Sequence, residues 1–119
     1  MKNNILLEKS FDFSLSIIDM YKYLIEEKRE YVMARQLLKS GTSIGANARE
    51  SSQAESRADF IHKLSISLKE AHECEYWIDL LTRANFLGNE KSLKAKKDLD
   101  EVISLLTRII KTTKVRSKP

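Results

Sequence analysis

The side chains best suited to chemistry in this 119-residue chain are basic ones, which gather in two segments. Residues 28–54 hold five basic and two acidic residues, and residues 90–119 hold nine basic and four acidic residues. Lys and Arg contact phosphate groups, and such contacts dominate the salt-dependent binding of nucleic acids. The candidates for phosphate contact are Arg29, Arg35, Lys39, Arg49, Lys111, Lys114 and Arg116. No aromatic platform of the single-strand-binding kind stands out, so we expect contacts mainly to the backbone.

Arg57 and His62, in the segment RADFIH, form the pair most similar to a catalytic centre. Their Arg-x4-His spacing is similar to that of helical-bundle ribonucleases resembling the HEPN family, in which Arg and His act on the phosphodiester. The same residues also fit a solvated helix start and a surface position beside the apolar pair Phe60 and Ile61. A ribonuclease therefore ranks third among our interpretations.

Other catalytic and metal-binding patterns are poorly matched. A nucleophile and base could be formed by Ser43 or Ser67 with His62, but no carboxylate is spaced to orient the imidazole. Neither His62 nor His72 follows a Glu at the three-residue spacing that a di-iron helical bundle requires. The lone Cys74 lies in an apolar-periodic region, which predicts a buried thiol in an intracellular protein. We therefore expect no catalytic residue, metal, cofactor or small-molecule substrate.

Three glycines and a single proline are too few for the many turns of an all-β fold. This composition favours long helices. Apolar residues recur at three- and four-residue steps through most of the chain. Residues 1–119 are thus predicted to form one all-α domain, an antiparallel up-down-up-down four-helix bundle. The expected helices are about 11–28, 31–53, 57–85 and 90–114. Residues 1–10 are expected to be irregular, and the tail from residue 111 to be frayed.

Each predicted helix has an apolar stripe. In the first it is Phe11, Leu15, Ile18, Tyr21 and Ile25, with Phe13, Ile17 and Leu24 beside it. In the third it is Phe60, Leu64, Ser67, Ala71, Cys74, Ile78 and Leu81. In the fourth it is Leu99, Val102, Leu106, Ile109 and Thr113. Ser56 and Asp59 have the spacing of a capping box, and Gly88 suits a helix C-cap.

Small residues fill the segment Ser40–Ala48 of the second helix. We predict a continuous helix there rather than a loop, because the apolar phase is unbroken. Gly41 and Gly45 are four residues apart, so they share a face that a neighbouring helix can approach closely. The predicted close-packing residues are Gly41, Ile44, Gly45 and Ala48.

Apolar residues outside these stripes, such as Tyr76 and Leu80, exceed what one bundle core needs. They predict a second buried surface and hence self-association. No apolar run is long enough to span a bilayer, so we expect a cytoplasmic protein without a membrane partner.

The segments QLLKSGTSIGANARES, ESRADFIHKLSISLKEA and ECEYWIDLL resemble a known family. Its members are four-helix bundle proteins encoded within intervening sequences of bacterial 23S rRNA genes, and the family includes the accessory variability determinant of diversity-generating retroelements. The resemblance covers residues 11–113. It implies a ring-shaped homopentamer with a positively charged surface, binding to nucleic acid and, in the retroelement branch, to a reverse transcriptase. No catalytic residues come with it.

The sequence is therefore interpreted as a non-enzymatic, oligomeric helical bundle that binds nucleic acid, RNA or rRNA, through basic side chains of the second and fourth helices. The second interpretation is a protein-interaction scaffold or an accessory protein for a reverse transcriptase. In that case the basic charge serves solubility.

Overall fold

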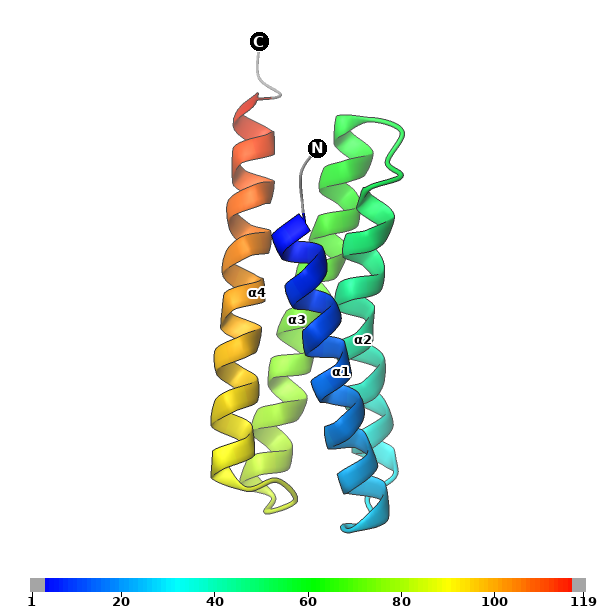
Figure 1. Ribbon diagram of the computed structural model, residues 1–119, viewed down its shortest axis with the longest axis vertical. Helices are drawn as coiled ribbons and strands as arrows, with labels where there is room; N and C mark the ends of the chain where they lie inside the picture. The colour runs from blue at the N-terminus through cyan, green and yellow to red at the C-terminus, as the bar shows by residue number, and fades with distance from the viewer. Residues whose placement is uncertain (1–3, 117–119) are drawn as a thin grey trace.

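The computed structural model describes residues 4–116, and within that range it contains α-helices and no strands. The elements are α1 (Asn4–Glu26), α2 (Val32–Ser51), α3 (Arg57–Arg83) and α4 (Asn89–Arg116). The helices lie side by side in a long bundle, with short connections at its two ends (Figure 1). The predicted all-α four-helix bundle is confirmed.

Contacts between neighbouring helices show that they are antiparallel. The Ser67 hydroxyl of α3 donates to the Ile44 carbonyl of α2 at 2.7 Å, and Lys63 pairs with Glu50 at 3.1 Å. Residue numbers therefore rise along α3 as they fall along α2. The corresponding pairs are Lys96–Asp79 and Arg57–Arg116 between α3 and α4, and Lys9–Glu101 and Lys91–Tyr23 between α1 and α4.

The α3 helix has the predicted core face. Its buried residues are Phe60, Leu64, Ser67, Ala71, Cys74, Ile78 and Leu81, which is the predicted heptad stripe. The predicted cap is also present, because the Ser56 hydroxyl accepts a hydrogen bond from the Asp59 backbone N–H at 3.0 Å. The Asp59 carboxylate in turn accepts from the Glu55 N–H at 3.2 Å. Local sequence thus fixes both the start and the rotation of α3.

The α1 helix differs from the prediction in its start and in its buried face. It begins at Asn4, because Leu6 is 1% exposed and anchors the first turns that were expected to be irregular. Its buried apolar residues are Leu6, Phe13, Ile17, Met20 and Leu24. Phe11 and Leu15 from the predicted stripe are instead 53% and 50% exposed. The helix carries two apolar stripes, and the predicted stripe is the one whose residues Phe11 and Leu15 face solvent.

The ends of α3 and α4 also require corrections. Asn85, and not Gly88, takes the left-handed conformation after α3, with φ 67°. The backbone N–H groups of Asn85 and Phe86 donate to the carbonyls of Thr82 and Leu81, the pattern of a Schellman motif. Asn tolerates this conformation better than most residues, so no glycine is needed.

The α4 helix continues to Arg116, so its predicted frayed tail is wrong within the described residues. Thr113 is buried near the start of α3 and helps to hold the last turns. Ile110 is buried rather than the predicted Ile109, which is half-buried. Residues 117–119 lie outside the described range.

The α2 helix is continuous through Ser40–Ser43, as predicted. The hydroxyls of Ser40, Thr42 and Ser43 donate to carbonyls four residues earlier in the same helix, at 2.9, 2.7 and 2.6 Å. Hydroxyls that would favour a turn are therefore satisfied within the helix.

The predicted close approach at the glycines is confirmed, and the neighbour is α1. A Cβ atom on Gly41 would lie 2.8 Å from Cγ1 and Cγ2 of Ile17. A Cβ atom on Gly45 would lie 3.3 Å from the Ser10 carbonyl oxygen. Ile44 and Ala48, on the same side of α2, are fully buried. The small residues of α2 therefore let α1 pack close to its backbone.

We expect Gly41→Val to lower the free energy of unfolding by about 1–3 kcal/mol, because the added carbons overlap Ile17. Urea denaturation measures the change. Gly88→Ala is the control, because a Cβ there meets nothing within 4 Å. In an Ile17→Ala background the cost of Gly41→Val should shrink. An unchanged midpoint for Gly41→Val would contradict the close approach.

Candidate nucleic-acid interface

All seven basic residues proposed for phosphate contact have exposed side chains. Arg29 lies in the connection between α1 and α2, in a left-handed conformation with φ 54°. The others are Arg35, Lys39 and Arg49 on α2, and Lys111, Lys114 and Arg116 on α4. Their exposure leaves every one of them accessible to a ligand.

The structure does not bring these residues together on one face. The α2 and α4 helices each pack against α1 and α3 but not against each other, so they occupy diagonal corners of the bundle (Figure 1). Arg29 and Arg35 lie in or near the α1–α2 connection, and Lys111, Lys114 and Arg116 lie in the last turns of α4. These two segments are at opposite ends of the bundle (Figure 1). Basic side chains of α2 and α4 therefore do not share one face within a single chain. There are two separate basic surfaces.

The candidate side chains are not neutralised by carboxylates. Ion pairs within residues 4–116 use other cations, namely Lys9, Lys63, Lys94, Lys96 and His72. Hydrogen bonds to Glu50 and Asp79 raise the pKa values of Lys63 and Lys96. The seven candidates form no ion pair in the described range, so their charge is available to a polyanion.

The stretches of sequence that carry the two surfaces contain no acidic residues. No Asp or Glu occurs between Val32 and Arg49 in α2, or after Glu101 in α4. The acidic residues that flank α2 are engaged. Glu30 accepts from the Ala34 backbone N–H at 2.9 Å, and Glu50 pairs with Lys63. Each helix therefore presents a stretch of purely positive charge.

Arg49 has a different environment from the other candidates. Its guanidinium lies over the ring of Phe11 on α1, 5.9 Å from the ring centroid. A cation–π contact at an exposed site is worth about 0.5–1 kcal/mol, so it orients Arg49 without removing its charge. Arg49 therefore belongs to the α1–α2 boundary rather than to the outer face of α2.

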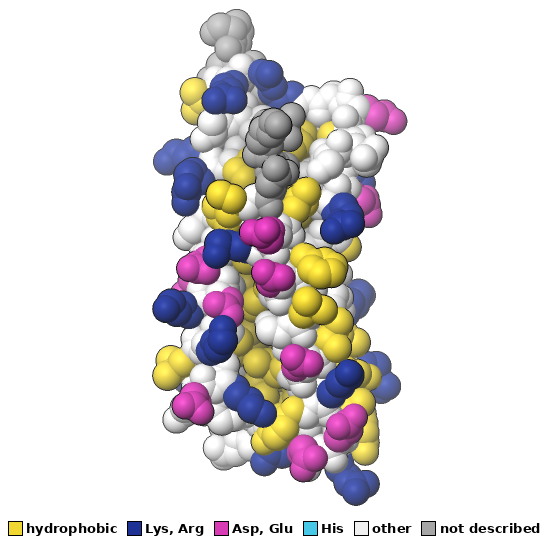
Figure 2. Space-filling model, viewed as in Figure 1, with side chains coloured by type: hydrophobic (Ala, Val, Ile, Leu, Met, Phe, Trp, Pro, Cys, Tyr) yellow, Lys and Arg dark blue, Asp and Glu magenta, His cyan; other side chains and the backbone are white. Residues whose placement is uncertain are grey.

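The same boundary carries a feature that the sequence prediction missed. Phe11 and Leu15 project from α1 into solvent, with the half-buried Ile18 near them in the helix. Apolar side chains gather on this side of the bundle in Figure 2. We call Phe11, Leu15 and Ile18 the α1 strip. The signal is present in the sequence, because these residues recur at helical spacing, but the same spacing also predicts a core stripe.

Arg57 and His62 do not form a joint site in this structure. The Arg57 guanidinium donates to the carbonyl of Arg116 at 2.8 Å, which ties the start of α3 to the last turn of α4. His62 is exposed, and no hydrogen bond or ion pair links it to Arg57 among the described residues. The arrangement gives Arg57 a role at the end of a helix, where a cation is favourable.

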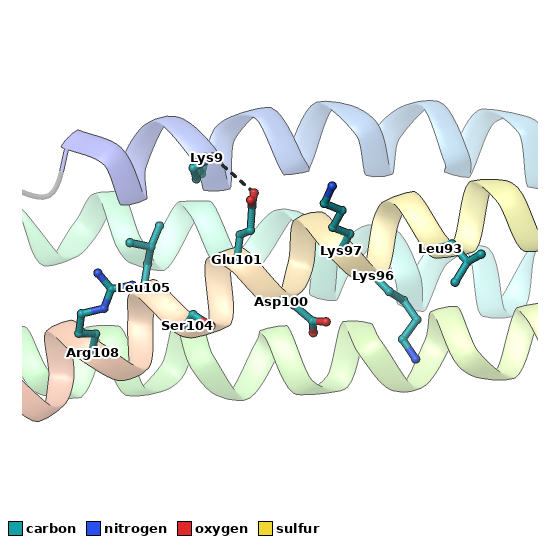
Figure 3. A pocket seen from close by; sticks show the side chains of 9 residues that line it. All are labelled: Lys9, Leu93, Lys96, Lys97, Asp100, Glu101, Ser104, Leu105 and Arg108. Atoms are coloured by element: carbon teal, nitrogen blue, oxygen red, sulfur yellow. Dashed lines mark hydrogen bonds and ion pairs between the residues drawn. The ribbon is translucent and has the colours of Figure 1, made fainter.

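A groove along the outer side of α4 has mixed charge. Lys97 and Arg108 line it together with Asp100 and Glu101, and Lys9 of α1 pairs with Glu101 at 3.4 Å (Figure 3). Acidic and basic groups alternate there, so the groove is less suited to a polyanion than the end of α4.

The structure shows neither a reactive thiol nor a metal-binding cluster among the described residues. Burial raises the pKa of the Cys74 thiol to about 12, which keeps it protonated and unreactive. Within residues 4–116 there is no cluster of His, Cys, Asp or Glu side chains that could hold a metal ion. None of the described helices is long and apolar enough to cross a membrane.

Fold and surface together define an antiparallel four-helix bundle protein whose candidate contacts lie on exposed helix faces. The chain belongs to the family of 23S rRNA-intervening sequence proteins, whose family model matches residues 2–108. It is also similar to a crystal structure at 1.70 Å resolution of a protein from Bacteroides thetaiotaomicron VPI-5482, described as a protein of unknown function from the S23 ribosomal protein family. The two chains share 50% identity with a TM-score of 0.91, over 93% of this chain and 99% of the other. A comparison with curated proteins gives no match.

We expect the purified protein to leave RNA intact, because Arg57 is held by a backbone carbonyl and is not linked to His62. Gel electrophoresis of labelled RNA after incubation measures this. Cleavage by the wild type that His62→Ala abolishes would establish the ribonuclease instead. Cleavage that persists in His62→Ala would point to a contaminating nuclease.

Proposed function

We propose that this protein is a non-enzymatic, self-associating helical bundle that binds nucleic acid through backbone phosphates. The observation that carries the proposal is the unpaired positive charge at the end of α4, where Lys111 and Lys114 follow a stretch without acidic residues. Contacts of this kind attract any phosphate backbone and need no base recognition.

The family supports RNA as the ligand, because its name links the members to intervening sequences of 23S rRNA. The acid-free face of α2, with Arg35 and Lys39, supplies a second surface of the same charge. A cytoplasmic location is part of the proposal and agrees with the buried thiol of Cys74.

Self-association is supported by the α1 strip. Full burial of such an apolar side chain contributes about 1.5–3 kcal/mol, and burying the exposed halves of Phe11 and Leu15 contributes roughly half of that each. Because α2 and α4 face apart in one chain, contact between copies is the way to bring an α4 surface beside a neighbouring α2 surface. We propose a ring-shaped homopentamer, as the family resemblance implies, with basic side chains contributed by every copy.

A second candidate function is an accessory or scaffold protein, in the retroelement case for a reverse transcriptase. The α1 strip favours it, because exposed apolar side chains at helical spacing are typical of a protein contact. In that case the strip contacts the enzyme, and the basic surfaces contribute little to binding.

We expect Lys111→Ala/Lys114→Ala to weaken binding to RNA and to make it less salt-dependent. For two lost phosphate contacts the slope of log K against log salt should become shallower by roughly 1.4–1.8. Fluorescence anisotropy of a labelled RNA across a salt series measures both quantities.

The matched control is Lys9→Ala/Lys94→Ala, which removes the same charge from lysines already paired with Glu101 and Asp98. It should change the slope much less. Equal effects of the two double variants would show that net charge, and not the α4 surface, determines binding.

Phe11→Glu/Leu15→Glu should reduce the mass of the protein in solution, because two carboxylates would be buried in the proposed contact. Light scattering coupled to gel filtration measures the mass, and Val32→Glu, at another exposed apolar position, is the control. A monomeric wild type, or an unchanged mass in the double variant, would rule out self-association through the α1 strip.

A further inference from the structure

We infer that Tyr31 is a stacking platform for an unpaired base, and that Arg35 and Lys39 bind the phosphates beside it. This rests on the proposed binding of nucleic acid and specifies the ligand as a single strand. The sequence predicts no aromatic platform, because the exposure of Tyr31 depends on the packing at the start of α2.

Tyr31 is available for such a contact. It is the N-cap residue of α2, is 48% exposed, and makes no side-chain hydrogen bond at the cap. The other tyrosines are more engaged. Tyr21 and Tyr23 are partly buried against the core, and Lys91 covers the Tyr23 ring at 3.6 Å. Tyr76 is exposed but packs edge-on against Trp77, with 5.1 Å between the ring centroids.

The basic residues that follow Tyr31 lie on the same side of α2. Arg35 and Lys39 succeed it at four-residue steps, and each step advances about 6 Å along the helix axis. Both side chains are exposed, as is Val32, which follows Tyr31 in the sequence. We call Tyr31, Arg35 and Lys39 the α2 track. An aromatic ring followed by evenly spaced cations matches a strand whose base stacks on the ring and whose backbone continues along the helix.

The charges around the α2 track favour an anionic ligand. The carboxylate of Glu30, which precedes Tyr31 in the sequence, accepts a hydrogen bond from the Ala34 backbone N–H at 2.9 Å. Glu26, the last residue of α1, and Glu27 after it are exposed, and the adjacent exposed cations Lys28 and Arg29 offset their charge. Farther along α2, no acidic residue occurs before Glu50.

Stacking distinguishes a single strand from a duplex. Every base has a face that can stack on an aromatic ring, but in a duplex both faces are already covered by neighbouring bases. The α2 track should therefore add affinity only for unpaired nucleotides, whereas the end of α4 should bind both forms. RNA and DNA share this chemistry, so both are used as probes.

The test compares Tyr31→Leu and Tyr31→Phe with the wild type. The probes are labelled RNA and DNA strands of about 12 nucleotides, within the span that a small domain binds. The same strands annealed to their complements serve as duplex probes. Tyr31→Leu should weaken single-strand binding about tenfold and leave duplex binding unchanged, while Tyr31→Phe should bind within about twofold of the wild type. Thermal unfolding followed by circular dichroism checks that each variant is folded.

The salt dependence separates stacking from charge. Tyr31→Leu should leave the slope of log K against log salt unchanged, because the ring carries no charge. Arg35→Ala/Lys39→Ala should make the slope shallower by roughly 1.4, since single strands release about 0.7 counterions per contact. Tyr31→Trp provides a direct signal, because a stacked base quenches the fluorescence that this variant gains over the wild type.

Failure of this inference can be told apart from failure of the proposed function. If the wild type binds RNA and Lys111→Ala/Lys114→Ala weakens it, but Tyr31→Leu binds the single strand as tightly as the wild type, only the α2 track is ruled out. An equal loss on single strand and duplex in Tyr31→Leu would also rule out stacking. A wild type that binds neither form overturns both proposals.

Discussion

The close approach of α1 and α2 determines how the rest of the surface is arranged. Because Gly41 and Gly45 have no Cβ, the Ile17 side chain and the Ser10 backbone of α1 pack close against them. One side of α1 must therefore face α2 and the core. Any rotation of α1 that buried Phe11 would remove Ile17 from the space above Gly41. The α1 strip is exposed because this packing uses the other apolar side of the helix. Arg49, one turn after Gly45, is placed over Phe11 by the same contact.

The sequence predicted the buried face of α3 correctly because one apolar stripe dominates that helix. The buried residues of α3 matched because Phe60 to Leu81 repeat without a competing stripe. In α1 two stripes compete, and the choice between them depends on the glycines of another helix, which periodicity within α1 does not contain. Residue type alone predicts Gly88 as the C-cap of α3. In the structure Asn85 takes the left-handed conformation, and its backbone N–H donates to the Thr82 carbonyl.

The candidate interface was predictable in its residues but not in its arrangement. Basic side chains in acid-free stretches such as that of α4 are readable from the sequence, and their exposure follows from helical phase. The diagonal placement of α2 and α4 depends on which helices pack together. Whether a carboxylate meets a lysine also depends on tertiary contacts, as the pairs Lys63–Glu50 and Lys96–Asp79 show.

The hydrogen bond from Ser67 to the Ile44 carbonyl fixes the register of α2 against α3. Sliding one helix past the other would leave a buried hydroxyl without its acceptor, which costs about 1–3 kcal/mol. The pair α2–α3 should therefore move as one rigid hairpin. Of the four helix pairs that pack together, α1 and α4 have the smallest contact, and surface contacts such as Lys9–Glu101 join them. Local opening of the bundle should accordingly begin where α1 meets α4. The backbone amides of α2 and α3 should exchange their hydrogens most slowly.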